Sequence, residues 1–164
     1  MTAGGRSRRM TVLNLSGPIP RGSVLLEASA GTGKTFALTT LIARSLAEGL
    51  VDVDNLLVVT FTRAATRELR DKVRDKINEA TAALRQADGP PEPWISPLVA
   101  GSATERAERL ARLQAAAIDL DRAWITTIHG FCRQALQLLG AQGGLPHDTA
   151  FEGDSSKTRR QAVR

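Results

Sequence analysis

The chain has 164 residues, of which 42% are hydrophobic and 24% charged, and this composition excludes a disordered chain and fits one globular domain. The formal net charge of +5 suits an acidic partner such as nucleic acid, although many folded domains carry a similar excess. Cys132 is the single cysteine, so an internal disulfide is excluded. No apolar run reaches the roughly 18 residues of a transmembrane helix. We therefore expect a cytoplasmic location.

The first segment, residues 1–10, carries three arginines but no apolar stretch follows it. A secretory signal would need such a stretch, so we expect a disordered basic tail instead.

A glycine-rich loop at residues 27–35 organises the next part of the chain. Its sequence, Glu-Ala-Ser-Ala-Gly-Thr-Gly-Lys-Thr, follows a predicted strand at 23–27 and opens a predicted helix at 33–48, for which Gly49 is a good C-cap. Glycines let backbone N–H groups approach an anion closely, and a helix N-terminus adds further free donors. A glycine-rich turn without a ligand is the alternative interpretation.

The ending Gly-Lys-Thr indicates that the anion is a nucleoside polyphosphate. The pattern G-x-x-x-x-G-K-[ST] is met except at its first position, where Ala28 stands. We expect Lys34 to reach the β/γ-phosphates and the Thr35 hydroxyl to ligate Mg²⁺, which gives both residues a catalytic role. The predicted nucleotide-binding residues are Ala28, Ser29, Ala30, Gly31, Thr32, Gly33, Lys34 and Thr35.

Strands and helices alternate after this loop. A continuous apolar run predicts a strand at 56–60 that is covered on both faces, and a helix follows at 63–87. A capping box at Ser102 opens another helix, a short strand is predicted at 124–128, and a helix at 129–139 is stopped by glycines. This order predicts an α/β fold with a parallel sheet in a three-layer α/β/α arrangement.

The helix at 63–87 has one apolar face and one charged side. The apolar face consists of Leu69, Val73, Ile77, Ala80 and Leu84. Arginines, lysines and carboxylates alternate on the other side, which we interpret as a solvated face.

Hydroxyl groups and rings follow two of the strands at their carboxyl ends, where open α/β sheets bind ligands. Threonine hydroxyls can bond phosphate oxygens and flat rings can stack on bases. Burial of the two phenylalanine rings between sheet and helix is the alternative that composition favours, and for the histidine it is a backbone bond at a helix start. The predicted DNA-binding residues are Thr60, Phe61, Thr62, Arg63, Thr127, His129 and Phe131.

Three motifs in order resemble motifs I, Ia and Ib of superfamily 1A DNA helicases of the UvrD/Rep type, and most closely the RecB-like branch. They are Ala-Ser-Ala-Gly-Thr-Gly-Lys-Thr, Val-Val-Thr-Phe-Thr-Arg-Ala-Ala and Thr-Ile-His-Gly-Phe-Cys. The resemblance implies a RecA-like P-loop NTPase fold that uses ATP and Mg²⁺ and binds single-stranded DNA. It also implies a 3′–5′ helicase and exonuclease subunit that acts in double-strand break repair with RecC- and RecD-like partners.

The resemblance also implies how the chain is divided. We expect residues 11–140 to be the first part of helicase domain 1A and residues 141–164 to begin an inserted helical region. No apolar run ending in Asp-Glu follows the loop, so we expect the chain to be truncated before the Walker B strand and inactive alone. Three alternatives remain: a UvrD- or AddA-type helicase, a small P-loop phosphotransferase, and an inactive nucleotide- or DNA-binding module.

Overall fold

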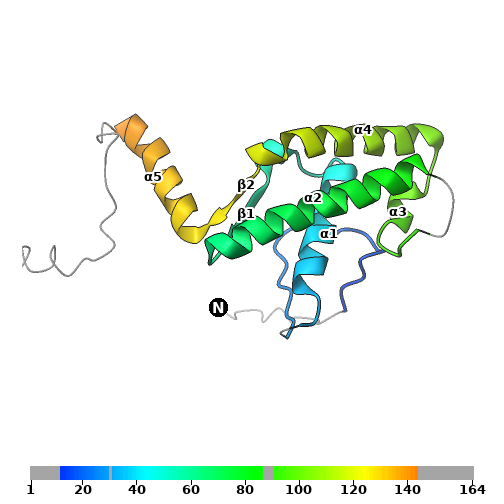
Figure 1. Cartoon of the computed structure of the whole chain (residues 1–164), viewed down its shortest axis with the longest axis horizontal. Coiled ribbons are helices and arrows are strands. Elements are labelled where there is room, and N and C mark those ends of the chain that lie inside the picture. The colour runs from blue at the N-terminus through cyan, green and yellow to red at the C-terminus, as the bar shows by residue number, and fades with distance from the viewer. Residues whose placement is uncertain (1–11, 30, 87–90, 144–164) are drawn as a thin grey trace, which may run out of the picture.

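A computed structural model describes residues 12–29, 31–86 and 91–143 of the chain (Figure 1). The basic tail expected at 1–10 and most of the inserted helical region expected at 141–164 lie outside these residues. The helices and strands, in chain order, are α1 (Lys34–Ala47), β1 (Leu57–Thr60), α2 (Arg63–Arg85), α3 (Ser96–Val99), α4 (Ala103–Asp119), β2 (Trp124–Thr127) and α5 (Ile128–Gly143), with short 3₁₀ turns at Val53–Asn55 and Leu120–Arg122.

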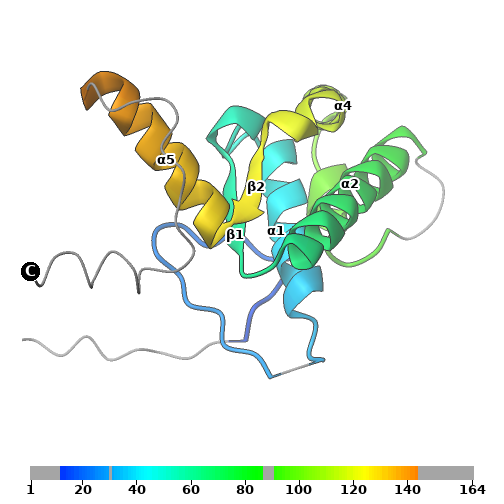
Figure 2. The same ribbon diagram turned by 60° about the vertical axis from the view of Figure 1, so that its left-hand side comes forward.

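The two strands confirm the predicted parallel sheet. β1 pairs with β2 in parallel, from Leu57 opposite Trp124 to Thr60 opposite Thr127. Figure 2 shows α1, α2 and α4 on one side of the two strands, while α5 leaves the end of β2 and projects on the other side. Parallel strands need such helical crossovers, which α2 to α4 supply here.

The core lies between α1, α2 and α4, where the apolar face predicted for α2 is buried. Val73, Ile77 and Ala80 are fully enclosed, and Leu69 nearly so. Trp94, in the segment before α3, is the largest fully buried side chain, and it closes the core at the end where α3 lies. Burying an aromatic ring of this size is a large share of the hydrophobic stabilisation available to so small a core.

The C-terminal end of α1 is fixed by the predicted glycine cap. Gly49 has φ of 69°, its N–H donates to the carbonyl of Leu46, and the N–H of Leu50 donates to Ser45. These two hydrogen bonds together form a Schellman motif. The start of α1 is less buried than its C-terminal half, because Phe36 and Leu38 are 44% and 37% exposed.

Two strand predictions need correction. Residues 23–27 form no strand, and Val24, Leu25 and Leu26 are 52%, 68% and 42% exposed. A strand requires a hydrogen-bonded neighbour, and within the described residues the sheet contains only β1 and β2. β1 is also not covered on both faces, because Leu57 and Val59 are each 47% exposed. The three-layer arrangement therefore stays a prediction.

The last helix is longer than the sequence pattern indicates. α5 continues through Gly140 to Gly143, although we expected these glycines to end it. A glycine inside a helix costs only about 1 kcal/mol relative to alanine, and it ends a helix only when it adopts the left-handed conformation.

Candidate nucleotide and nucleic-acid site

The loop before α1 has the backbone of an anion site. Gly31 and Gly33 have φ of 78° and 88°, and a Cβ added to either would meet no atom within 4 Å, so space is open on both. Gly33 precedes α1 without any capping side chain. The first N–H groups of α1 are therefore not bonded by a side chain and remain available to an external acceptor. Ala30 lies outside the described residues.

Three side chains in and after the loop have defined positions. Lys34 is exposed and its ammonium donates to the carbonyl of Ala28, across the mouth of the loop. Thr32 closes the turn by donating through its hydroxyl to Ser29 at 2.7 Å. Thr35, in the first turn of α1, offers one hydroxyl ligand for Mg²⁺, and magnesium commonly keeps water and phosphate oxygens as its other ligands. The described residues contain no group of three metal-ligating side chains.

The junction between β1 and α2 is held together by threonines. Thr62 is the N-cap of α2 and its hydroxyl accepts from the N–H of Ala65 at 3.1 Å. Thr60 lies 2.6 Å from Thr66 between their hydroxyl oxygens, so the strand end is tied to the first turn of the helix. Thr60 and Thr62, which were predicted to bind DNA, therefore have structural hydrogen bonds. Each hydroxyl oxygen can accept a further hydrogen bond near the exposed start of α2.

The junction between β2 and α5 repeats this arrangement. Thr127 directly precedes α5 and its hydroxyl accepts from the N–H of Gly130 at 3.0 Å. A Cβ on Gly130 would lie 2.5 Å from the hydroxyl oxygen of Thr126, so only glycine allows the helix to start this close to the strand. Since the strands are neighbours, α2 and α5 start side by side at one edge of the sheet.

The rings at this edge differ in exposure. Phe61 is 87% exposed, which contradicts the burial that composition favours, and His129 is also exposed. Phe131 is half-buried and packs edge-to-face on Trp124, with 6.1 Å between ring centroids. Phe61 and His129 are thus free to stack on a ligand, whereas Phe131 supports the sheet.

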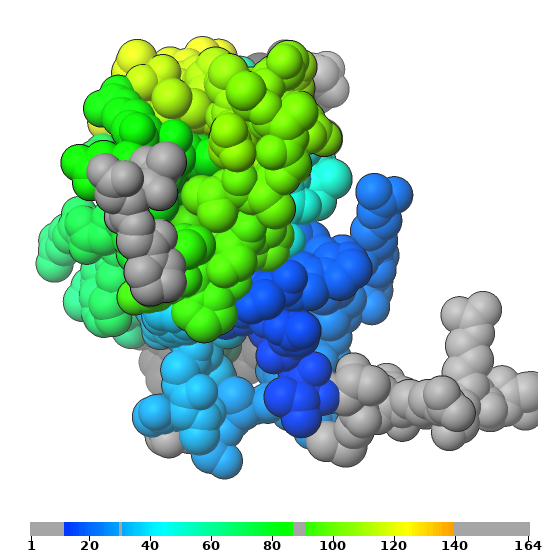
Figure 3. All heavy atoms as spheres, turned by 90° about the vertical axis from the view of Figure 1, so that its right-hand side faces the viewer, coloured from blue at the N-terminus to red at the C-terminus, as the bar shows by residue number. Residues whose placement is uncertain are grey.

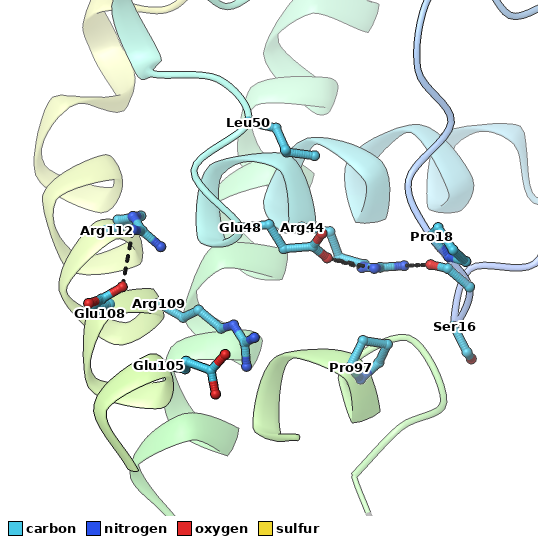
Figure 4. A pocket seen from close by; sticks show the side chains of 11 residues that line it. Ser16, Pro18, Arg44, Glu48, Leu50, Pro97, Glu105, Glu108, Arg109 and Arg112 are labelled. Carbon is cyan, nitrogen blue, oxygen red and sulfur yellow. Dashed lines mark hydrogen bonds and ion pairs between the residues drawn. The ribbon is translucent and has the colours of Figure 1, made fainter. Parts of the chain in front are cut away.

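A cavity of about 560 Å³ lies away from this edge, between segment 16–18, the C-terminal half of α1, α3 and α4 (Figure 4). Figure 3 shows the dark blue N-terminal segment lying against this side of the molecule. Arg44 is near the opposite end of α1 from Lys34, roughly 15 Å along the axis. The charges in the wall cancel, so we do not assign a phosphate to it; they are Arg44, Arg109, Arg112, Glu48, Glu105 and Glu108.

Comparison with known proteins agrees with this geometry. Residues 14–163 match the family model of the UvrD/REP helicase N-terminal domain. The chain belongs to this family. It is 48% identical over 137 residues to the RecBCD enzyme subunit RecB of Mycobacterium tuberculosis, a match that covers 82% of this chain and 12% of that protein. Identity to the RecB subunit of Escherichia coli is 38% over 152 residues, or 87% of this chain and 12% of that subunit.

Within the family the chain is the N-terminal part of a RecB-like helicase, and this confirms the resemblance drawn from the three motifs. The chain spans about an eighth of the length of these relatives, since the matches cover 12% of each. Among the described residues no helix combines the length and apolar character needed to cross a membrane.

Two structurally important residues escaped the sequence analysis. Arg44, 2% exposed, donates to the carbonyls of Leu15 and Gly17 and holds the N-terminal segment. The ammonium of Lys76 lies 4.5 Å from the ring centroid of Phe36 and 4.8 Å from that of Trp94. Such contacts depend on segments distant in the chain, so a helical period that marks Lys76 as solvated could not reveal them.

Proposed function

We propose that this chain is the nucleotide-binding N-terminal part of an ATP-dependent DNA helicase and exonuclease subunit. The complete protein uses ATP and Mg²⁺ to translocate 3′–5′ on single-stranded DNA in double-strand break repair and recombination. RecC- and RecD-like subunits are its proposed partners, and the cytoplasm its proposed location. Membership of the helicase family supports this proposal, and so do the relatives named as RecB subunits.

One observation carries the proposal: two helices with threonine N-caps start on neighbouring strand ends, each beside an exposed ring. Helix N-termini attract phosphate, and the rings of Phe61 and His129 offer faces for bases. Single strands are the substrate that presents both groups together. The phosphate loop before α1 supplies the nucleotide site, with Lys34 opposite the β/γ-phosphates and Thr35 on Mg²⁺.

The proposal is tested in the full-length protein by pairing two classes of variant. Lys34→Ala should abolish ATP hydrolysis, because it removes the charge aimed at the phosphates, and should leave single-strand affinity nearly unchanged. Phe61→Ala and His129→Ala should each weaken single-strand binding by about 1–3 kcal/mol and leave ATP affinity without DNA unchanged. Anisotropy of a labelled oligonucleotide at one fixed salt concentration and steady-state hydrolysis give the two readouts.

This crossed pattern also separates the proposal from a small phosphotransferase. A phosphotransferase would lose activity in Lys34→Ala and show no response to Phe61→Ala or to added single strands. We further propose that the 164-residue chain alone hydrolyses no ATP, because among its described residues Thr35 is the single assigned ligand of the metal. Hydrolysis by the isolated chain would contradict this part of the proposal.

A further inference from the structure

One flank of α2 carries a line of four arginines. Only the first of them belongs to one of the three motifs. Arg63, Arg67, Arg70 and Arg74 follow one another at spacings of four, three and four residues. These spacings place the side chains on one line almost parallel to the helix axis. The line begins directly after the N-cap Thr62, at the sheet edge that exposes Phe61.

The line keeps an excess of positive charge. Arg70 and Arg74 share one oxygen of Asp121, at 3.2 and 3.3 Å, and Arg70 also donates to the carbonyl of Ile125. Arg63 and Arg67 are exposed, and within the described ranges neither lies within 4.0 Å of a carboxylate. Of these four guanidinium groups, only two are therefore paired, and they share a single carboxylate.

The other side of the same helix behaves differently, because its lysines are paired one to one. Lys72 lies 2.5 Å from Glu68, and Lys76 lies 2.5 Å from Glu79. Asp71 and Asp75 lie on the exposed surface between the two sides and form no ion pair with the arginine line among the described residues. Among the described residues of α2, the cations without an ion pair thus lie on the arginine flank.

We propose that Arg63, Arg67 and Arg74 bind phosphates along the single strand of DNA whose bases stack on Phe61 and His129. This inference rests on the proposed function. The eleven helical steps from Arg63 to Arg74 span about 16 Å, which is several phosphate spacings of about 3.4 Å along a stacked strand. The forked guanidinium matches phosphate oxygens in pairs, which a lysine ammonium does not.

Arg70 has a different role, because its bonds hold it to the end of β2. Its two terminal nitrogens donate to Asp121 and to the carbonyl of Ile125, so the outer side of its guanidinium already has protein acceptors. In this proposal the single strand of DNA leaves the sheet edge at Thr62 and follows α2 toward Asp121. Oligonucleotides that are too short to pass Arg63 should bind through the sheet edge alone.

The test compares Arg67→Ala and Arg74→Ala with the matched control Lys72→Ala in the full-length protein. Binding of labelled poly(dT) oligonucleotides of increasing length is measured by anisotropy across a salt series. We expect each arginine variant to lose roughly three- to ten-fold in affinity for long strands near 0.1 M salt and to lower the salt slope by about 0.7 per lost phosphate contact. Lys72→Ala and the shortest strands should show no such loss, and Arg67→Lys should retain the slope.

Two results would overturn the inference. The first is an unchanged salt slope and length dependence in Arg67→Ala and Arg74→Ala while Phe61→Ala still weakens single-strand binding. This result would reject binding along the arginine line and leave the proposed function standing. An equal loss of single-strand affinity in Lys72→Ala would show that only the net charge of α2 matters, and it would also reject binding along the arginine line. If Phe61→Ala and His129→Ala also bind single strands normally, the proposed function itself fails.

Discussion

Thr60 and Thr127 face each other at the last register position of the parallel pair, and each opens into a helix start. The Thr60 hydroxyl reaches Thr66 in the first turn of α2, and the Thr127 hydroxyl accepts from the N–H of Gly130 in α5. The ends of the two strands thus fix where both helices begin. Phe61 directly follows Thr60 and His129 lies two residues after Thr127, so both exposed rings are next to these bonded positions.

Gly130→Ala should destabilise the protein through this junction. The added Cβ would lie 2.5 Å from the Thr126 hydroxyl oxygen and 3.2 Å from that of Thr127, so α5 must shift away from the strand. Overpacking of this kind costs about 1–3 kcal/mol, which urea denaturation of the full-length protein would measure.

The matched control is the double variant Gly130→Ala with Thr126→Ala, which removes the hydroxyl that the new methyl group meets. It should regain most of the stability that Gly130→Ala loses, because the closest contact is gone. A single Gly130→Ala variant that denatures like the parent would show that the junction is looser than described.

Arg44→Met should release the N-terminal segment. The Arg44 guanidinium donates to the carbonyls of Leu15 and Gly17 at 2.7 Å and pairs with Glu48 at 2.5 Å, almost shielded from water. Its loss leaves two carbonyls and a partly buried carboxylate without a donor, at a cost of about 2–4 kcal/mol. Thermal melting and limited proteolysis of residues 12–18 give the measurement.

An exposed ion pair serves as the comparison for Arg44. Arg122 pairs with Asp54 at 2.7 Å, but its side chain is 60% exposed, so Arg122→Met should cost less than about 1 kcal/mol. Equal destabilisation by both changes would contradict the buried role assigned to Arg44.

Local patterns predicted much of the fold, because the signals involved lie within a few residues. The capping box of Ser102 and Glu105, the Schellman glycine at position 49 and the apolar face of α2 are all set by neighbouring residues, and the structure contains each of them. The alternation of strand and helix likewise follows from periodicity, and the parallel pairing of β1 and β2 agrees with it.

Predictions that depended on distant partners were less successful. The apolar run at Val24 reads as a strand, but no described strand pairs with it. At the candidate site the residue types were recognised, yet the capping bonds of Thr62 and Thr127 and the exposure of Phe61 came only from the structure. Periodicity predicts which face of a helix is apolar, but it does not predict which residues a charged side chain contacts.

The start of α4 should respond to acid. The backbone N–H and the hydroxyl of Ser102 donate to Glu105, and these bonds hold the pKa of the Glu105 carboxyl below its usual range. Because the folded pKa is lower than the unfolded one, the stabilisation is present above the usual pKa of 4.5 and is lost as the pH falls through the folded value.

Glu105→Gln isolates this contribution. Lys72 lowers the pKa of Glu68 in the same direction, so the total acid dependence includes more than one carboxyl. The difference between parent and Glu105→Gln in chemical denaturation should therefore shrink below about pH 4.5 and stay constant above it. A difference that is independent of pH across this window would exclude an ionised capping carboxylate.

Lys76→Ala should loosen the first turn of α1, which contains Lys34 and Thr35, the residues proposed to bind phosphate and Mg²⁺. The Lys76 ammonium lies over the rings of Phe36 and Trp94. This side chain of α2 therefore contacts both α1 and the buried tryptophan. Cation–π contacts of this kind contribute about 0.5–2 kcal/mol each, and we expect a total loss of about 1–3 kcal/mol. Hydrogen exchange of the α1 amides, measured beside global denaturation, would locate the effect.

Two comparisons distinguish this role from general helix stabilisation. Lys72→Ala, one turn earlier on α2 and paired only with the exposed Glu68, should cost less than about 0.5 kcal/mol and leave α1 exchange unchanged. Lys76→Arg keeps a cation above both rings and should recover slow exchange in the first turn. If Lys76→Arg exchanges as fast as Lys76→Ala, the rings hold α1 by packing alone and the ammonium contributes nothing to the phosphate loop.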